Sequence, residues 1–177
     1  FNYDKREPEF LKKMHNGLVK FTKDWTEENW GHQAWMYYRM VEMVDANVGY
    51  ILSILESSSD YENTVIIFSS DHGDANGYHR MLFKDNFYDT SSKVPTFVSF
   101  PKAFKKGRID DSHLVSGLDF FPTFCDYAGI KPPDDLKGKS LKPLVENTTV
   151  QWRKYLHAQS KVQGRMVVDN QYKLSLI

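Results

Sequence analysis

The sequence predicts an α/β fold in which a mostly parallel sheet is flanked by helices, with a small antiparallel sheet at the C-terminal end. Residues 33–57 repeat apolar side chains at steps of three and four, which is typical of a helix with one apolar face. Residues 64–68 are a short apolar run without alternation, which favours a strand buried on both faces of a parallel sheet. A helix, a short loop and a buried strand in this order are characteristic of α/β sheets.

The predicted helix over residues 33–57 is expected to pack tightly against the sheet, because its apolar stripe is wide. Thr26 and the residues that follow it suit a helix start, and the serines from residue 57 onward suit its end. The apolar residues of the stripe are Tyr37, Met40, Val41, Met43, Val44, Val48, Tyr50, Ile51, Ile54 and Leu55.

The region after residue 93 predicts a second strand and a second helix of the same domain. The strand covers residues 94–100, and the basic residues 102–108 are expected to form a solvated turn. The helix has Asp119 as its N-cap, holds Pro122 in its first turn and ends at Gly129. These two elements therefore continue the α/β pattern.

The end of the chain predicts antiparallel strands. Residues 155–159, 165–168 and 172–176 are short, partly alternating and separated by turn residues. Asp169-Asn170 suits the turn of a hairpin between the last two strands. We therefore expect a small antiparallel sheet here.

Composition and charge exclude several classes of partner. The 177 residues include 23 basic and 23 acidic ones, so the sequence gives no electrostatic reason to expect a nucleic acid or a membrane surface as partner. The apolar runs are too short to span a membrane. Cys125 is the single cysteine and lies in an apolar helix, so it is expected to be a core residue. The chain begins without Met or an apolar leader, and we expect it to lie inside a longer polypeptide.

A candidate site follows the predicted strand at Asp71-His72-Gly73. Ligands of open α/β sheets bind just beyond the carboxyl ends of the strands, where these residues are expected to lie. A carboxylate beside an imidazole suits a divalent cation. From these residues alone, an ordinary loop that stabilises a turn is an equal alternative.

The residues that follow carry a resemblance to a known family. The chain resembles the sulfatases of the alkaline phosphatase superfamily, in the branch that writes its metal motif as Ser-Asp-His-Gly. Those enzymes follow this motif with a loop rich in glycine and histidine, then a lysine, and then a basic residue before Val-Pro. Here the lysine is Lys84, and the closing signature is Lys93-Val94-Pro95. Together with the helix after Asp119 and the stretch 136–144, the resemblance covers most of residues 33–145.

The resemblance implies an alkaline-phosphatase-like sandwich and a division of the chain. Residues 1–145 are expected to be the C-terminal portion of the sulfatase catalytic α/β domain. Residues 146–177 are expected to be part of a C-terminal antiparallel subdomain that helps to shape the substrate pocket. The N-terminal half of the catalytic domain is expected to be absent from this chain.

The resemblance also assigns roles to site residues. Hydrolysis of a sulfate ester requires a cation and fixed positive charges around the sulfate oxygens and the leaving oxygen. Asp71 and His72 are expected to serve calcium, or another divalent cation, beside the nucleophile. Lys84 is expected to contact the sulfate and the leaving-group oxygen. His79 is a candidate for substrate contact or proton transfer, although a role in stabilising its turn is an equal alternative.

The nucleophile of the family has no counterpart in this chain. Sulfatases use a formylglycine made from Cys or Ser in a Cys/Ser-x-Pro-x-Arg motif, and neither Ser99 nor Cys125 begins such a motif. The modified residue is therefore expected upstream, in the parent protein. The chain alone is not expected to turn over substrate, and one Asp–His pair is expected to hold calcium poorly, because that ion takes six or more oxygen ligands.

The resemblance thus predicts a parent enzyme that hydrolyses sulfate monoesters of a sulfated small molecule or glycan. A phosphonate or phosphate monoesterase of the same superfamily and a non-catalytic interaction module are the alternatives. By resemblance, export to the periplasm, cell surface or lysosome is expected. Without its other half the chain should expose sheet surface, which predicts self-association or completion by a partner fragment.

Overall fold

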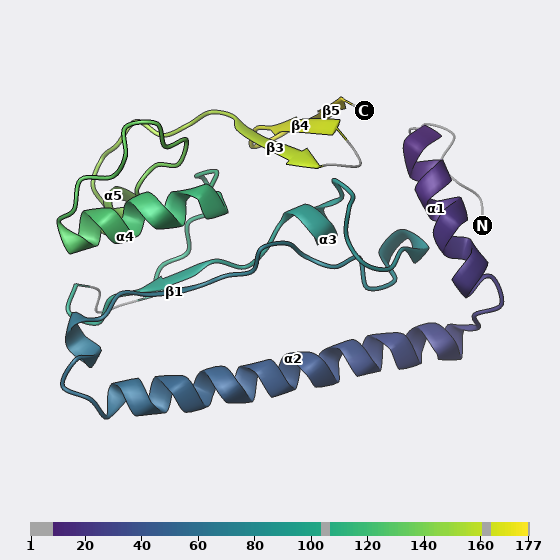
Figure 1. Cartoon of the computed structure of the whole chain (residues 1–177), viewed down its shortest axis with the longest axis horizontal. Helices are drawn as coiled ribbons and strands as arrows, with labels where there is room; N and C mark the ends of the chain where they lie inside the picture. The colour runs from purple at the N-terminus through teal and green to yellow at the C-terminus, as the bar shows by residue number, and fades with distance from the viewer. Residues whose placement is uncertain (1–8, 104–106, 161–163, 177) are drawn as a thin grey trace.

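The computed structural model describes residues 9–103, 107–160 and 164–176. Two strands near the middle of the chain, β1 (Ile66–Phe68) and β2 (Phe97–Ser99), lie between the long helix α2 (Glu27–Glu56) and helix α4 (Phe120–Ala128) (Figure 1). Helix α1 (Glu9–Thr22) precedes α2, and a three-stranded sheet ends the chain. Helices on both sides of strands confirm the predicted α/β class. None of the described helices combines the length and apolarity that a membrane crossing requires.

Helix α2 begins where the sequence suggested. The Thr26 hydroxyl accepts a hydrogen bond from the Asn29 backbone N–H at 3.3 Å, and the Thr26 N–H donates to the Asn29 side chain at 2.9 Å. This reciprocal capping starts the helix six residues before the predicted apolar stripe at residue 33.

The expected tight packing of α2 is wrong for the described chain. No residue of α2 is buried, and Met43 and Ile51 are 66% and 63% exposed. The physical reason is that β1 and β2 form only a two-stranded ribbon, which is too narrow to cover the wide apolar stripe.

The strand pairing also differs from the prediction. Strands β1 and β2 pair antiparallel, with Ile67 opposite Val98. The connection from β1 to β2 contains two short helices, the 3-10 helix η2 (Tyr78–Arg80) and α3 (Asp89–Ser92), and it brings β2 back beside β1 in the opposite direction. Phe68 is 41% exposed, so the prediction of a strand buried on both faces in a parallel sheet is wrong within the described residues.

Helix α4 keeps its predicted position, but Asp119, the residue before it, has a different role from the predicted one. Gly129 adopts a left-handed conformation, with φ of 67°, at the C-terminal end, and Cys125 is buried as predicted. Asp119 precedes the helix, but its side chain does not cap it. The Asp119 carboxylate instead accepts a hydrogen bond from the Ser116 N–H, and it forms an ion pair with Arg153.

The segment after α4 folds back onto the start of that helix. A Cβ at Gly138 would overlap the Leu118 carbonyl, so only glycine allows this close approach. The Leu141 N–H then donates to the Thr123 hydroxyl at 2.8 Å, and α5 (Lys142–Val145) follows. The buried apolar residues of the described chain are Ala75, Met81, Cys125, Leu141, Leu144 and Met166.

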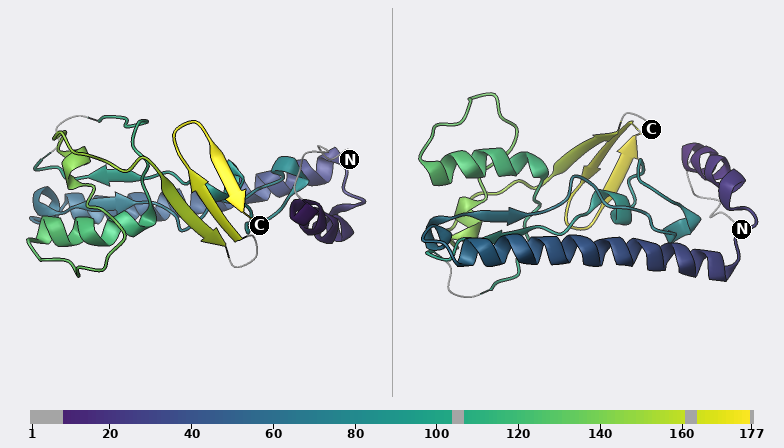
Figure 2. Two further views of the ribbon diagram at one scale, coloured as in Figure 1. Left: turned by 90° about the horizontal axis from the view of Figure 1, so that it is seen from above. Right: turned by 60° about the horizontal axis from the view of Figure 1, so that its bottom comes forward.

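The predicted antiparallel sheet at the C-terminal end is confirmed. Strands β3 (Leu156–Ser160), β4 (Gly164–Val168) and β5 (Lys173–Leu176) pair antiparallel in this order. The Asp169 carboxylate accepts hydrogen bonds from the backbone N–H groups of Gln171 and Tyr172, which closes the predicted turn between β4 and β5. Both views in Figure 2 show this sheet beside the segment that contains α3.

The basic stretch 102–108 lies partly outside the described residues, since 104–106 are not among them. The described residues of this stretch are exposed, as predicted for a solvated turn, and Arg108 at its end also contacts α5 and the residues that follow it. Its guanidinium donates to the Leu144 carbonyl and to the Asn147 side chain. Arg108 therefore fixes this turn to the end of α5.

Candidate active site

Asp71 and His72 lie in the loop that directly follows β1, as the sequence predicted. The next residue, Gly73, holds this loop against α3. A Cβ at Gly73 would overlap the Thr90 carbonyl oxygen, and the Gly73 N–H donates to the Ser91 carbonyl at 2.9 Å. The glycine of the motif is therefore required for close approach of two backbones.

The structure brings three of the predicted site residues together. The Lys84 ammonium contacts Nε2 of His72, although twelve residues separate them in sequence. Asp71 Oδ2 lies 3.3 Å from the same His72 nitrogen. On the other side of the ring, Nδ1 of His72 lies 2.8 Å from the Gly73 carbonyl, which accepts a hydrogen bond from it and thereby fixes the ring orientation. Asp71, His72 and Lys84 thus form one cluster.

The Asp71 carboxylate is held in its charged form. Partial desolvation raises the pKa of Asp71. The neighbouring His72, the His72 backbone N–H and Lys84 lower it, and together they outweigh the desolvation. The net effect places the pKa of Asp71 below its ordinary value of 3.8. An ionised carboxylate beside a lysine suits binding of a cation on one side and of an anion on the other.

The residues of this cluster fit only part of a divalent cation site. Asp71 offers a carboxylate, but Nε2 of His72 already faces Lys84. Among the described residues, no group of three or more His, Cys, Asp or Glu side chains could hold a metal ion. Calcium takes six to eight oxygen ligands, so the described residues alone do not form a calcium site.

His79 lies in the same loop but is held by aromatic rings. It stacks on Tyr88 with ring centroids 4.0 Å apart and meets Tyr78 edge to face. Within the described part of the chain, His79 makes no polar contact with Asp71, His72 or Lys84. This arrangement favours the turn-stabilising alternative over a place in the cluster.

The loop that carries His79 and Lys84 has a strained backbone. Five residues between 76 and 85 that are not glycine have positive φ, a conformation that costs free energy for L residues. They are Asn76, His79, Arg80, Phe83 and Asp85. Such strain is found where surrounding structure fixes a functional loop, and here Gly77 packs on the Trp30 ring at the start of α2.

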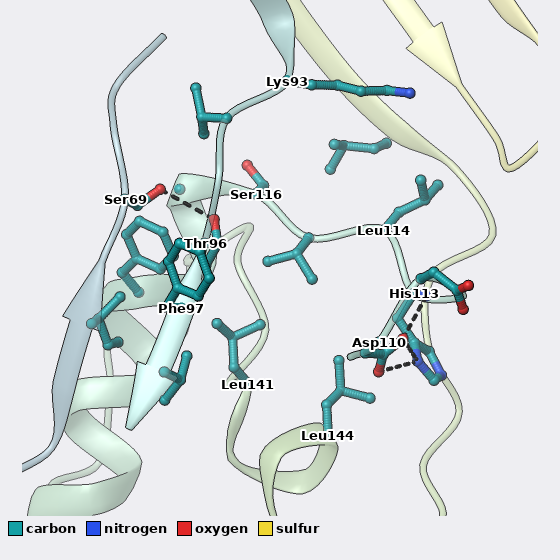
Figure 3. A pocket seen from close by; sticks show the side chains of 18 of the residues that line it. Ser69, Lys93, Thr96, Phe97, Asp110, His113, Leu114, Ser116, Leu141 and Leu144 are labelled. Atoms are coloured by element: carbon teal, nitrogen blue, oxygen red, sulfur yellow. Dashed lines mark hydrogen bonds and ion pairs between the residues drawn. The ribbon is translucent and has the colours of Figure 1, made fainter. Parts of the chain in front are cut away.

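A wide groove runs from the end of β1 to the C-terminal sheet (Figure 3). Its volume is about 1750 Å³, and its lining includes Asp71. Figure 3 shows Lys93 at one side of the groove and Asp110 with His113 at another. Of the predicted site residues only Asp71 lines it, whereas His72, His79 and Lys84 do not. The groove is therefore adjacent to the cluster but does not enclose it.

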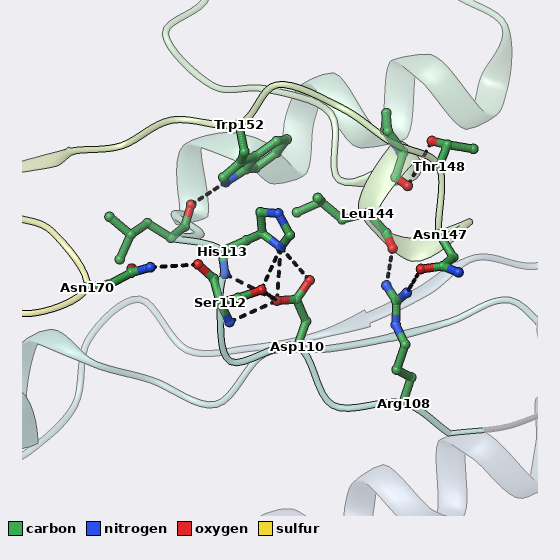
Figure 4. A network of polar contacts seen from close by, with 11 residues as sticks. Arg108, Asp110, Ser112, His113, Leu144, Asn147, Thr148, Trp152 and Asn170 are labelled. Carbon is green, nitrogen blue, oxygen red and sulfur yellow. Dashed lines mark hydrogen bonds and ion pairs between the residues drawn. The ribbon is translucent and has the colours of Figure 1, made fainter.

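A polar network at the far side of the groove was not singled out from the sequence (Figure 4). Nδ1 of His113 lies 2.8 Å from the Asp110 carboxylate, and the Ser112 carbonyl accepts a hydrogen bond from Asn170 at 2.9 Å. Desolvation raises the pKa of Asp110, but hydrogen bonds from His113 and Ser112 outweigh it and lower the pKa to about 2. The only sequence signal is the Asp-x-x-His spacing, which is too short a motif to identify a site.

Solved structures share the fold of this chain. A 2-O GAG sulfatase superposes with a TM-score of 0.77 and 30% identity, over 86% of this chain and 35% of the other. The phosphonate monoester hydrolase of Agrobacterium radiobacter superposes with a TM-score of 0.70 and 28% identity, over 85% of this chain and 34% of the other. The fold is thus that of the sulfatases and phosphonate hydrolases of the alkaline phosphatase superfamily.

Sequence comparison identifies the family. Residues 77–175 match the profile described as N-sulphoglucosamine sulphohydrolase, C-terminal. N-acetylglucosamine-6-O-sulfatase of Bacteroides thetaiotaomicron is 38% identical over 136 residues, which are 73% of this chain and 24% of the relative. Arylsulfatase of Clostridium perfringens is 36% identical over 126 residues, 70% of this chain and 26% of the relative. The chain belongs to the sulfatase family, and it spans about a quarter of the length of these relatives.

Proposed function

We propose that this chain is the C-terminal part of a sulfatase that hydrolyses sulfate monoesters of sulfated carbohydrates. The observation that carries the proposal is the contact of Lys84 with His72 beside Asp71, directly after β1. A family match and relatives that are sulfatases support it. One structurally similar protein is known in complex with its substrate D-glucosamine-2-N,6-O-disulfate, at a TM-score of 0.69 and 30% identity, which favours a sulfated amino sugar or glycan as substrate class.

In this proposal Lys84 provides the fixed positive charge that the reaction requires. Negative charge on the sulfate oxygens and on the leaving oxygen increases as the S–O bond breaks. A compact ammonium held in place by the His72 ring can stabilise that charge without reorganisation. His72 orients the ammonium, because its own ring is fixed through Nδ1 to the Gly73 carbonyl.

Asp71 is proposed to contribute to a divalent cation site, with calcium as the expected ion. His72 would join it as a ligand if its Nε2 turned from Lys84 to the cation. The remaining ligands would come from residues outside the described chain, since Asp71 and His72 supply too few. A bound cation would neutralise charge on the sulfate. The low pKa of Asp71 supports the role, because the carboxylate stays ionised and able to bind a cation at neutral pH.

The parent protein is proposed to supply what this chain lacks. A formylglycine nucleophile would lie in the upstream half of the catalytic domain, with residues 1–145 completing that domain and residues 146–177 forming part of the C-terminal subdomain. Export to the periplasm, cell surface or lysosome is proposed by analogy with the family. His79 is retained only as a candidate for substrate contact, since its ring is stacked on Tyr88.

A phosphonate or phosphate monoesterase is the second candidate. The observation in its favour is the phosphonate monoester hydrolase fold, which matches this chain nearly as well as the sulfatase folds do. Both reactions use a cation and a lysine-like charge around a tetrahedral anion, so the cluster alone does not distinguish them.

Hydrolysis of matched aryl esters by the intact protein separates these candidates. Sulfate, phosphate and phosphonate esters with the same leaving group are compared, with and without Lys84→Ala. We expect sulfate to be preferred and Lys84→Ala to lower kcat about 100-fold or more, the effect of removing one preorganised charge-stabilising group. The control is Lys131→Ala, which removes a surface lysine paired with Asp134. Preference for a phosphoryl ester would favour the monoesterase, and absence of all three activities would favour a non-catalytic module.

A further inference from the structure

The side chain of Lys173 connects the C-terminal sheet to the segment around α3, which lies next to the candidate site. The ammonium of Lys173, the first residue of β5, donates to the Phe87 carbonyl at 2.7 Å and contacts the Asp89 carboxylate. Only a quarter of the Lys173 side chain is exposed. The hydrogen bond to Phe87 joins residues 86 positions apart in sequence, and beside it the half-exposed Asp89 carboxylate pairs with the same ammonium.

The Asp89 carboxylate forms ion pairs with two lysines. Its Oδ1 faces Lys173, and its Oδ2 lies 2.7 Å from the ammonium of Lys93. Hydrogen bonds from Lys173 and then from Lys93 lower the pKa of Asp89 below 3.8, so the carboxylate is charged at neutral pH. Asp89 is thus a charged junction between β5 and the first turn of α3.

Helix α3 in turn holds the loop with Asp71 and His72. The Thr90 carbonyl packs on Gly73 without room for a side chain, and the Ser91 carbonyl accepts a hydrogen bond from the Gly73 N–H. A shift of α3 would therefore displace Gly73 and its neighbour His72. Because His72 contacts Lys84, the same shift would change the position of the Lys84 ammonium.

We propose that Lys173 is a positioning residue that sets the geometry of Lys84 and His72 through Asp89 and α3. The proposal rests on the proposed function for its catalytic consequence, but its structural part does not. It assigns the C-terminal sheet a second role besides packing, because the sheet then determines where the charge of Lys84 lies. Contacts to outer partners of a site commonly affect activity about 10- to 100-fold, and Lys173 is expected to act in this range.

The test compares three variants of the intact protein by hydrogen–deuterium exchange and by kinetics. Lys173→Met removes the charge at similar length, Lys173→Arg keeps it, and Lys154→Met removes a lysine that lies over the Tyr155 ring as a matched control. Exchange is followed separately in peptides covering residues 71–93 and in peptides from α4 and the C-terminal sheet. The kinetic substrate is the aryl ester that the unmodified protein hydrolyses best.

We expect Lys173→Met to increase exchange in residues 71–93 selectively and to lower kcat about tenfold with a smaller change in KM. In Lys173→Arg, the exchange in residues 71–93 and kcat should stay close to those of the unmodified protein. Lys154→Met should change neither the exchange nor kcat. Unchanged exchange in residues 71–93, equal increases throughout the protein, or an arginine variant as impaired as the methionine variant would each overturn the proposal. If the unmodified protein hydrolyses no ester, the proposed function fails, whereas the exchange experiment still decides on the contact.

Discussion

At the scale of single residues, Gly73 is the position in the candidate site where one methyl group matters. A Cβ there would overlap the Thr90 carbonyl oxygen, which belongs to backbone and cannot move aside. Gly73→Ala is therefore expected to destabilise the protein by about 1–3 kcal/mol, the usual cost of overpacking. Unfolding of the variant in urea, followed by fluorescence, measures this free energy.

Gly49→Ala is the matched control for Gly73→Ala. Gly49 lies inside α2, and a Cβ there would meet nothing within 4 Å. Alanine is a better helix former than glycine by about 1 kcal/mol, so this variant should be more stable than the original. Equal effects of the two substitutions would contradict the close approach of Gly73 to α3.

Asp110 gives a prediction about pH. Its folded pKa of about 2 is lower than the ordinary 3.8, so its charged form stabilises the folded state. This stabilisation is fully present above pH 3.8 and is lost as the pH falls towards 2. Asp110→Asn should therefore flatten the decrease in stability between these two pH values, as measured by the urea midpoint at each pH. Asp111→Asn, at the exposed neighbouring carboxylate, is the control. If stability falls as steeply in Asp110→Asn as in the unmodified protein, Asp110 does not have this role.

At the scale of elements, α4 depends on a buried ion pair at its start. Asp119 is fully buried, and its carboxylate accepts two hydrogen bonds from the Arg153 guanidinium at 2.6 and 2.5 Å. It also accepts hydrogen bonds from the backbone N–H groups of Ser116 and Lys139, each at 2.8 Å. The chain before α4, the chain after it and the segment leading to β3 therefore meet at one carboxylate.

Removing this charge should be costly. Asp119→Asn leaves the Arg153 guanidinium, whose side chain is 12% exposed, without its partner charge, and about 3–5 kcal/mol of stability should be lost. Chemical denaturation provides the measurement. Asp134→Asn, at an exposed pair with Lys131, should change stability by about 1 kcal/mol or less. A loss for Asp119→Asn that is no larger than for this control would show that the pair is not structurally important.

The elements differ in how far the sequence predicted them. The capping residues of α2, Gly129 at the end of α4 and the turn at Asp169 were predictable, because each depends on local backbone geometry. The antiparallel pairing of β1 with β2 was not, since the apolar run of residues 64–68 specifies burial and not the direction of its neighbour. Asp119 was misread for a related reason, because its partner Arg153 lies 34 residues away.

The candidate site shows the same division. Asp71, His72 and Lys84 were predicted to act together, and the structure brings them into contact. The resemblance to the sulfatase motif, in the order and spacing of its residues, led to that prediction. The junction at Asp89 was not predicted, because Lys173 comes from the distant C-terminal sheet, and nothing in the local pattern of either residue indicates the other. His79 was a candidate by proximity in sequence, and its stacking on Tyr88 depends on a strained loop that sequence patterns do not encode.

At the scale of the whole molecule, the chain exposes more surface than a compact protein of its size. Its accessible surface is 13271 Å², whereas a compact monomer of 20.7 kDa exposes about 9,000 Å². The difference of about 4,000 Å² is as large as an obligate interface. Apolar side chains of α2 contribute to this surface, since Met40, Met43, Tyr50 and Ile54 are all more than half exposed. Contiguous exposed apolar side chains of this kind are typical of surfaces that bind another polypeptide.

The 177-residue chain by itself is therefore expected to self-associate. Sedimentation velocity between micromolar and tens of micromolar concentrations should show species larger than a monomer, because the exposed apolar face of α2 has no cover within the described chain. Met43→Lys combined with Ile54→Lys should shift the distribution towards monomer, since two charges on this face oppose its burial. Ile109→Lys is the control, as Ile109 is 91% exposed but lies in a loop and is not part of α2. A monomer at every concentration would show that the chain does not associate despite its surface. An equal effect of the control would show that association occurs but that the apolar face of α2 does not drive it.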